Sequence, residues 1–121
     1  MTDRELLELA AKAAGIKGFR YVNNEPIQGG YRTGLWSDLY EDFWNPLTDD
    51  GDALRLAVKL RLEIVRNRIT DARLPVVSCH KIYVDVHEEE RWQWEFDEAG
   101  PYAATRRAIT RAAAEIGRNM L

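Results

Sequence analysis

The sequence predicts an α+β fold in which a small antiparallel sheet of three to four strands packs with helices as an α-β-α sandwich. Apolar residues recur at three- and four-residue spacing near residues 3–14, 49–60 and 101–117, which is typical of helices. Residues 60–97 instead alternate with a period of two, which is typical of strands. The length of 121 residues, with 45% hydrophobic and 31% charged composition, predicts a single domain at 1–121.

A capping box predicts the start of the first helix. Thr2 is placed to accept a hydrogen bond from the amide of Glu5, while the Glu5 side chain reaches back. We expect this helix to run to about Ala14, because Gly15 can adopt the left-handed conformation that ends a helix. Ile16 is then placed to pack back onto the last turn.

The aromatic-rich segment at about 19–43 is predicted to be an insertion within the domain. It has no sustained helical period, and Arg20–Val22 predicts only a short strand. Seven of the twelve aromatic residues fall in this segment and at its end: Phe19, Tyr21, Tyr31, Trp36, Tyr40, Phe43 and Trp44. One interpretation is a satellite core, with Leu35–Phe43 forming a short helix that packs its rings on the domain.

The other interpretation of the segment is a recognition surface, since aromatic rings and arginines stack on planar ligands and anchor partner proteins. Its candidate ligand- or partner-binding residues are Arg20, Tyr31, Arg32, Trp36, Tyr40 and Trp44. A ligand pocket predicts that these side chains converge on a cleft. Packing is the commoner use of large aromatic side chains, and both interpretations stay open.

The stretch from Trp44 to Leu60 joins a turn rich in Pro, Thr, Asp and Gly to an apolar helix. This helix is expected to begin within a residue or two of Asp49, whose carboxylate can cap the free amides. The predicted inward face consists of Leu54, Ala57 and Val58, and the predicted wet face of Arg55 and Lys59. The acidic turn lacks the spacing of a calcium loop, so no metal site is predicted.

Three strands are predicted between residues 60 and 97. The first runs from Leu60 to about Ile69, and the other two form a hairpin with its tip at Glu88–Glu90. The residues expected on the inner face of the hairpin are Ile82, Val84, Val86, Trp92, Trp94 and Phe96. Their facing positions predict aromatic to β-branched cross-strand pairs.

The last helix is predicted to open at Gly100–Pro101, because proline suits the first helical position. Its expected buried stripe is Tyr102, Thr105, Ile109, Ala112, Ile116 and Met120, and its expected exposed line is Arg107, Arg111, Glu115 and Arg118. A nucleic-acid-binding face would consist of Arg106, Arg107, Arg111 and Arg118. The net charge of -3 and the usual solvation of charged helix faces argue against this role.

Residues suited to catalysis are scattered rather than clustered. His80 and His87 fall on opposite faces of a predicted strand, and Cys79 has no activating neighbour. Glu88 and Glu90 lie at an exposed hairpin tip without the burial that tunes an acid. We therefore expect no enzymatic activity, no catalytic residue, no metal and no cofactor, with an uncharacterised hydrolase as an alternative.

Three separated blocks resemble the phage ABA sandwich domain family of small phage and prophage proteins. They are DRELLELAAKAAG at Asp3–Gly15, WNPLTDDGDALRLAVKL at Trp44–Leu60 and YAATRRAITRAAAEIG at Tyr102–Gly117, about 46 of 121 residues in the family's order. The resemblance implies a phage or prophage product with a small sheet between helices. It also implies that residues 19–43 are an elaboration, since family members are often shorter between the blocks.

The expected function is that of a phage accessory protein with a non-catalytic binding role. It would interfere with a host system, as an anti-defence protein does, by binding a host protein or by sequestering a small nucleotide-like ligand. Nucleic-acid binding through the last helix is an alternative, and homo-oligomers are compatible with the sequence. A single cysteine, no apolar signal region and no apolar run of membrane-spanning length favour an intracellular, reducing location and exclude a membrane role. The resemblance to phage proteins implies that this location is the cytoplasm of a bacterial host.

Overall fold

The computed structural model describes residues 1–66, 76–81, 93–96 and 100–120 of the chain. The described elements are α1 (Asp3–Ala14), β1 (Arg20–Ile27), β2 (Gly30–Ser37), β3 (Asp42–Trp44), α2 (Asp50–Leu60), β4 (Leu62–Arg66), β5 (Val76–Lys81), β6 (Gln93–Phe96) and α3 (Pro101–Arg118). They confirm the α+β class, with an antiparallel sheet packed on helices. No helix in these ranges is both long and apolar enough to cross a membrane.

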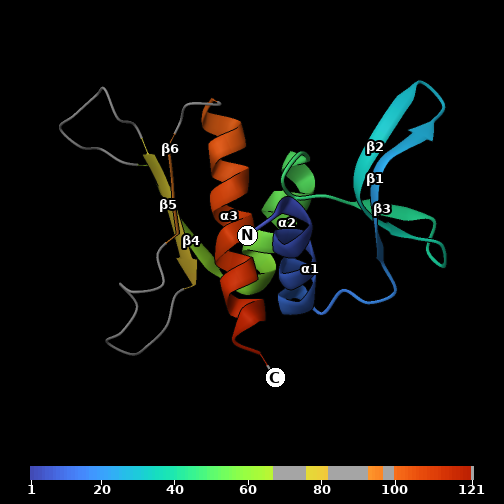
Figure 1. Cartoon of the computed structure of the whole chain (residues 1–121). Coiled ribbons are helices and arrows are strands. Elements are labelled where there is room, and N and C mark those ends of the chain that lie inside the picture. Colours follow the sequence, from blue (N-terminus) through green and yellow to red (C-terminus); the bar gives the residue numbers. More distant parts are fainter. Residues whose placement is uncertain (67–75, 82–92, 97–99, 121) are drawn as a thin grey trace.

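The strands form two antiparallel sheets of three strands, in the orders β1-β2-β3 and β4-β5-β6. Figure 1 shows the three helices in the middle, with one sheet on each side. The second sheet corresponds to the strands predicted between residues 60 and 97, whereas the first is built from the aromatic-rich segment. The layers therefore run sheet, helices, sheet, which differs from the predicted sandwich with a sheet between helices.

The predicted helix ends are confirmed. Thr2 caps α1 by accepting from the amide of Glu5, and Gly15 ends it with a φ of 71°. The amide of Ile16 then donates to the carbonyl of Ala11 at 2.9 Å. Asp49 caps α2 in the same way, by accepting from the amide of Asp52 at 2.8 Å.

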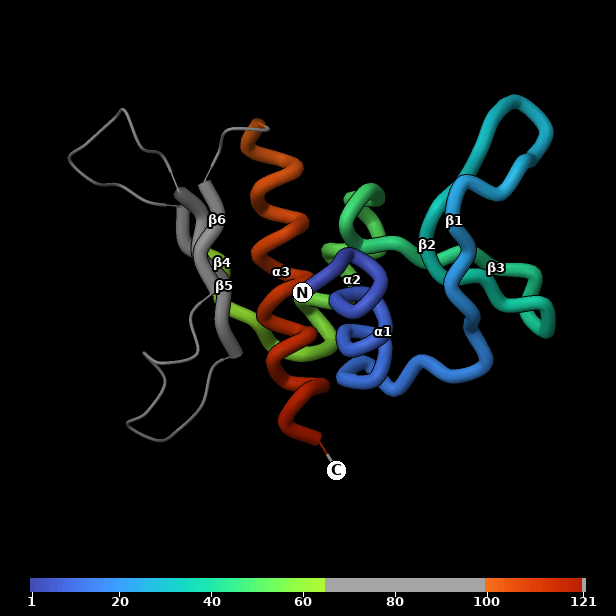
Figure 2. Tube along the Cα trace, in the orientation of Figure 1, coloured from blue at the N-terminus to red at the C-terminus, as the bar shows by residue number. Residues whose placement is uncertain are grey.

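Close packing of α1 on α3 forms the centre of the core. The two helices run in the same direction, with Arg107 paired to Asp3 near one end and Lys12 bonded to the carbonyl of Met120 near the other (Figure 2). Their buried faces are rich in small residues: Ala10, Ala11, Ala14, Ala104, Ala108, Ala112, Ala113 and Gly117. Small side chains let the two backbones approach closely.

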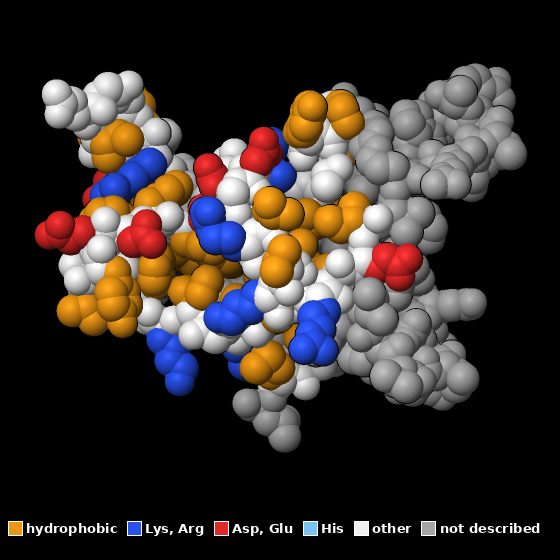
Figure 3. Space-filling model, turned by 180° about the vertical axis from the view of Figure 1, so that it is seen from behind, with side chains coloured by type: hydrophobic (Ala, Val, Ile, Leu, Met, Phe, Trp, Pro, Cys, Tyr) orange, Lys and Arg blue, Asp and Glu red, His pale blue; other side chains and the backbone are white. Residues whose placement is uncertain are grey.

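The predicted inward face of α2 is wrong in part. Leu54 and Val58 are 62% and 69% exposed, whereas the buried apolar residues are Ala53, Leu56, Ala57 and Leu60. Apolar residues occupy more than half of the circumference of this helix, and the neighbouring elements cover only one flank. Figure 3 shows hydrophobic side chains across the middle of the surface seen from behind, with Lys and Arg side chains between them.

The predicted buried stripe of α3 is also corrected. Tyr102 is 74% exposed and Met120 is 42% exposed, whereas Ala108 and Ala113 are fully buried. The cause is that α3 packs against α1, α2 and the second sheet at once, so that its small residues face close neighbours. The line expected to be exposed is half-buried at Arg107, Arg111 and Glu115, and exposed only at Arg118.

The short helix predicted at Leu35–Phe43 is absent, because this stretch forms β2, a turn and β3. Leu35 pairs with Tyr21 on one side and Trp44 on the other, and Trp36 pairs with Arg20 and Phe43. Neighbouring residues of a strand point to opposite faces, so these two sets lie on opposite faces of the sheet. Leu35 and Trp44 belong to the core cluster, and Tyr21 packs against it.

The first strand of the predicted hairpin begins directly after Pro75, which the sequence places at the start of a strand, and before the alternation that begins near Ile82. β5 spans Val76–Lys81, and Cys79 pairs with Gln93 of β6. Trp94 and Phe96 lie in β6 as expected. The other predicted inner-face residues, the hairpin tip and the predicted strand end at Ile69 lie outside the described residues, as does His87.

Candidate binding site beside Trp44

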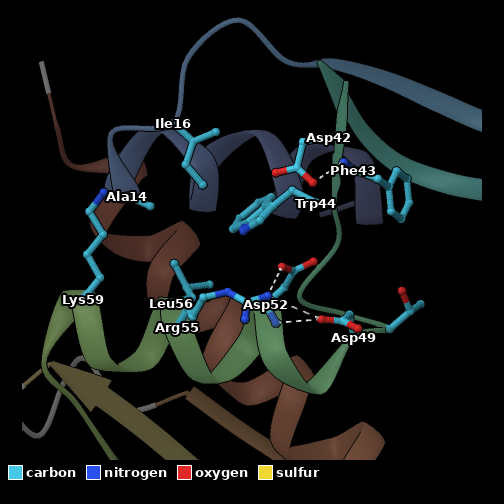
Figure 4. A pocket seen from close by; sticks show the side chains of 11 residues that line it. Ala14, Ile16, Asp42, Phe43, Trp44, Asp49, Asp52, Arg55, Leu56 and Lys59 are labelled. Atoms are coloured by element: carbon cyan, nitrogen blue, oxygen red, sulfur yellow. Dashed lines mark hydrogen bonds and ion pairs between the residues drawn. The ribbon is translucent and has the colours of Figure 1, made fainter. Parts of the chain in front are cut away.

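A solvent-open groove of about 620 Å³ lies between β3, the end of α1 and one flank of α2 (Figure 4). Its lining comprises Ala14, Ile16, Asp42, Phe43, Trp44, Thr48, Asp49, Asp52, Arg55, Leu56 and Lys59. The apolar lining comes mostly from the core side, and the charged groups come mostly from β3 and α2. This volume lies in the range typical of sites for small ligands.

The turn between β3 and α2 holds the groove in shape. The buried Asn45 donates its side-chain amide to the carbonyl of Thr33 at 2.7 Å, and its side-chain oxygen accepts from the amide of Leu47 at 2.9 Å. Its own backbone amide donates to the Asp52 carboxylate at 2.9 Å. These bonds tie both β2 and α2 to the residue next to Trp44, so the indole has a rigid support.

The indole of Trp44 is the most informative group in the groove. Its residue is 8% exposed and packs in the core cluster. In the part of the chain that the structure describes, the indole N–H has no hydrogen-bond partner. Figure 4 shows the indole nitrogen on the edge of the ring that faces the hollow. Buried tryptophan N–H groups usually donate to a partner, so this edge is ready for an acceptor in the groove.

Arg55 and Lys59 are the two cations of the groove, and only Arg55 is paired with carboxylates in the described part of the fold. Arg55 is held by Asp52 at 2.8 Å and by Asp49 at 3.8 Å, and the hydrogen bond to Asp52 raises the pKa of Arg55 above its ordinary value. Lys59 has no ion pair or hydrogen bond with any described residue, and Figure 4 shows it reaching from α2 toward Ala14. Lys59 is therefore the cation that a ligand can neutralise.

On the opposite rim, Asp42 provides an acceptor. One of its oxygens accepts from the amide of Phe43 at 2.8 Å, and the carboxylate points toward the groove above Trp44 (Figure 4). The groove thus combines an N–H donor, an ammonium and a carboxylate with an apolar wall. Such a mixed lining can orient a ligand that is partly planar and partly anionic.

Of the six residues predicted from the aromatic segment, Trp44 lines this groove. Arg20 lines a second hollow of about 490 Å³ between α1 and β1, while Tyr31 and Tyr40 are 70% and 67% exposed. Arg32 stacks its guanidinium on the Trp36 ring, 3.8 Å from the centroid, and pairs with Glu25 at 3.1 Å. Arg32 and Trp36 therefore pack on each other rather than on an open cleft.

Arg20, Trp36 and Asp38 form a small polar cluster. The Asp38 carboxylate accepts from Arg20 at 3.0 Å and from the Trp36 indole N–H at 2.8 Å. The hydrogen bond from Arg20, followed by that from Trp36, lowers the pKa of Asp38 below the ordinary value of 3.8. The hydrogen bond to Asp38 likewise raises the pKa of Arg20.

We expect the Asp38 carboxyl to titrate below pH 3.8 in the folded protein. Because a lowered folded pKa means that folding favours the ionised form, the stabilisation from this cluster is present above the unfolded pKa. It is lost as the pH falls through the folded pKa. Carbon-13 NMR of the carboxyl measures the midpoint, and the Trp36 indole N–H shift should follow the same curve.

The Arg20→Gln variant should raise the titration midpoint of Asp38, because it removes the hydrogen bond that contributes most to lowering the Asp38 pKa. Arg4→Gln is the matched control, since Arg4 pairs instead with Glu8 at 2.7 Å. An unchanged midpoint in Arg20→Gln would show that Arg20 does not hold the Asp38 carboxylate in solution.

The predicted basic face of α3 is largely engaged within the fold. Arg106 donates to the carbonyl of Leu47 at 2.9 Å and pairs with Asp50 at 2.7 Å. Arg107 pairs with Asp3 at 3.0 Å. Arg118 lies 3.8 Å from Glu115, and Arg111 also has an interaction partner. Arg106 and Arg107 therefore tie α3 to α2 and α1, and this arrangement differs from an open phosphate-binding patch.

Sequence reasoning missed Asp42 and Lys59 as groove residues, and it placed Lys59 only on a wet helix face. The one available signal was the proximity of Trp44 to a charged helix. Ile16 was expected to pack on α1, and it does so while lining the groove.

The sequence blocks at 3–15, 44–60 and 102–117 form α1, the segment from β3 to α2, and α3. The groove is lined by the first two of these blocks together with Asp42, Phe43 and Ile16. In the described ranges, no group of three or more His, Cys, Asp or Glu side chains is arranged to hold a metal ion. In comparisons with known proteins, no family model, curated protein or solved structure matches the chain.

Proposed function

We propose that this chain is a non-catalytic binding protein that sequesters a small nucleotide-like ligand in the groove beside Trp44. The observation that supports it most is the indole N–H of Trp44, which faces the solvent-open groove without a partner among the described residues. A ligand acceptor would replace water at this N–H, and such an exchanged hydrogen bond contributes about 0.5 to 1.5 kcal/mol.

The chemistry of the lining supports the nucleotide-like class. An anionic group of the ligand, such as a phosphate, pairs with Lys59, and a ring acceptor takes the N–H of Trp44. Asp42 can accept a hydrogen bond from an exocyclic amine on the same ligand. Ile16 and Leu56 supply apolar contacts for the planar part.

The biological setting is proposed from the three helical blocks. Their resemblance to the phage ABA sandwich proteins supports a phage or prophage accessory protein acting in the cytoplasm of a bacterial host. In that setting, sequestering a nucleotide-like signal would interfere with a host system without any catalytic step. Alternatively, the same groove would bind a host protein instead of a nucleotide-like ligand.

The direct test is an NMR titration that follows the indole N–H peaks of the four tryptophans. The probes are adenosine and guanosine monophosphate, with adenosine and inorganic phosphate as the two partial ligands. The proposal expects the Trp44 peak to move with the nucleotides and to move less with either part alone. If no nucleotide shifts this peak at millimolar concentration, the nucleotide form is wrong and the host-protein form is favoured.

Two substitutions should weaken nucleotide binding by about tenfold each, because each removes one donor to the ligand. They are Trp44→Phe, which deletes the indole N–H, and Lys59→Gln, which deletes the ammonium. Isothermal titration calorimetry measures the affinity. Trp36→Phe and Lys17→Gln are matched controls outside this groove and should leave the affinity unchanged. Equal losses in variants and controls would contradict the assignment of the groove.

A further inference from the structure

The opposite flank of α2 carries another hollow of about 540 Å³, formed with β4 and the start of α3. Its lining comprises Asp50, Ala53, Leu54, Ile64, Pro101, Tyr102, Thr105, Arg106 and Ile109. Large apolar side chains on this flank and beside it are exposed: Leu54 by 62%, Val58 by 69%, Ile64 by 37% and Tyr102 by 74%. Leu54, Ile64 and Tyr102 line the same hollow, and exposed apolar side chains gathered in this way mark an interaction site more often than scattered ones do.

The exposed side of α2 has an ordered sequence of charges. Asp50, Leu54, Val58 and Arg61 follow one another at helical spacing of four, four and three residues, and all four are exposed. The stripe thus begins with an acid, continues with two apolar side chains and ends with a base. A second stripe laid antiparallel to the first therefore places its base beside the first acid, its acid beside the first base, and its two apolar side chains beside the first apolar pair.

We propose that a second copy of this chain docks on this stripe, with the two α2 helices packed antiparallel about a two-fold axis. Leu54 then faces Val58 of the second copy, and Asp50 faces Arg61 of the second copy. Because the interface is isologous, each contact occurs twice. A parallel arrangement would instead place Asp50 against Asp50 and Arg61 against Arg61.

The charged groups of Asp50 and Arg61 are both accessible for intermolecular pairs. The Asp50 side chain is 72% exposed while one of its oxygens binds Arg106 at 2.7 Å, so its other oxygen can accept from a second cation. Arg61 is exposed at the end of α2 and has no ion pair with any described residue. Antiparallel α2 helices also place opposite ends of their macrodipoles together.

The first test is the molar mass in solution, measured by light scattering after size exclusion. We expect the wild-type chain to have twice its mass of 14.0 kDa. Leu54→Lys should weaken the dimer at least tenfold, because it buries a charge against Val58. Leu39→Lys is the matched control, since Leu39 is 77% exposed in the β2–β3 turn, and it should stay dimeric. A monomeric wild type at 100 μM, or a fully dimeric Leu54→Lys variant, would overturn the proposal.

A charge-reversal experiment tests the antiparallel geometry itself. Asp50→Arg and Arg61→Asp should each weaken self-association relative to the wild type, because both copies then carry like charges at the facing positions. In a parallel pair the wild type already has like charges facing each other, so neither substitution would weaken it. Mixing the two variants should restore a heterodimer, since every facing pair is complementary again. Native mass spectrometry counts homodimers and heterodimers in the mixture. A mixture without preferential heterodimer would show that the helices do not meet in this register.

Discussion

Replacing Gly117 with alanine should lower the free energy of unfolding by about 2 to 3 kcal/mol. The expected sign is opposite to that of helix propensity, because alanine is favoured over glycine inside a helix by about 1 kcal/mol. A Cβ at Gly117 would overlap the carbonyl oxygen of Leu9 and lie 2.8 Å from its carbonyl carbon. The neighbour is backbone, so it cannot move aside as a flexible side chain would.

Chemical denaturation followed by far-UV circular dichroism measures this loss. Gly51→Ala is the matched control, because the nearest atoms to its added Cβ are side-chain atoms of Arg55 and Asp49 at 3.1 and 3.2 Å. These flexible groups can shift, so the control should be neutral or slightly stabilising. A Gly117→Ala variant as stable as the Gly51→Ala variant would mean that α1 and α3 are farther apart than described.

Replacing Asp52 with alanine should cost about 2 to 3 kcal/mol of stability, the second large effect. The Asp52 carboxylate is buried at 8% exposure and accepts from the backbone amide of Asn45 at 2.9 Å. Removing it leaves a buried N–H without a partner and also releases Arg55. Because Asn45 follows Trp44, we also expect the indole to lose its fixed position.

Thermal and urea unfolding measure the stability change, and the Trp44 indole peak reports the local loss of order. Asp52→Asn should lose about half as much, because an amide oxygen can still accept from Asn45 while the charge pair with Arg55 is gone. Asp3→Ala is the control for an exposed aspartate paired with an arginine, and it should cost less than about 1 kcal/mol. If Asp3→Ala and Asp52→Ala lower the free energy of unfolding by the same amount, the buried hydrogen bond of the Asp52 carboxylate contributes nothing to stability.

Local chemistry made several features predictable. The Thr2 cap, the left-handed Gly15 and the Asp49 cap each depend on residues within a few positions of one another, and all three are present. The period change after Leu60 likewise marks the end of α2, where Arg61 adopts a φ of 56°. Such features follow from backbone geometry and short-range hydrogen bonds, which distant parts of the chain alter little.

The predictions that were wrong concern segments whose sequence pattern fits two different structures. Trp36, Tyr40 and Phe43 have helical spacing, but pairing of Leu35 with Tyr21 and Trp44 turns the segment into strands. In α2, both Leu54 and Leu56 fit an apolar face, and Leu56 is the one buried because it belongs to the core cluster that Trp44 and residues of α3 also form. Tertiary contacts override local preference in such cases.

The candidate site was only partly visible in the sequence. Trp44 could be named from its aromatic character, but Ile16 is 28 positions away and Lys59 is 15 positions away along the chain. Their meeting depends on how the end of α1, β3 and α2 pack. The absence of a described partner for the indole N–H is likewise a property of the packed core, because it depends on every neighbour at once.

The sequence by itself determined the α+β class, the caps of α1 and α2, and the three antiparallel strands between residues 60 and 97. Periodicity and capping are sufficient for these, since they act within one element or between neighbours. Only the tertiary structure decided that the aromatic segment forms its own sheet, that Arg106 and Arg107 bind within the fold, and that Trp44 borders an open groove. Burial and pairing are set by which surfaces meet, and no local pattern specifies that meeting.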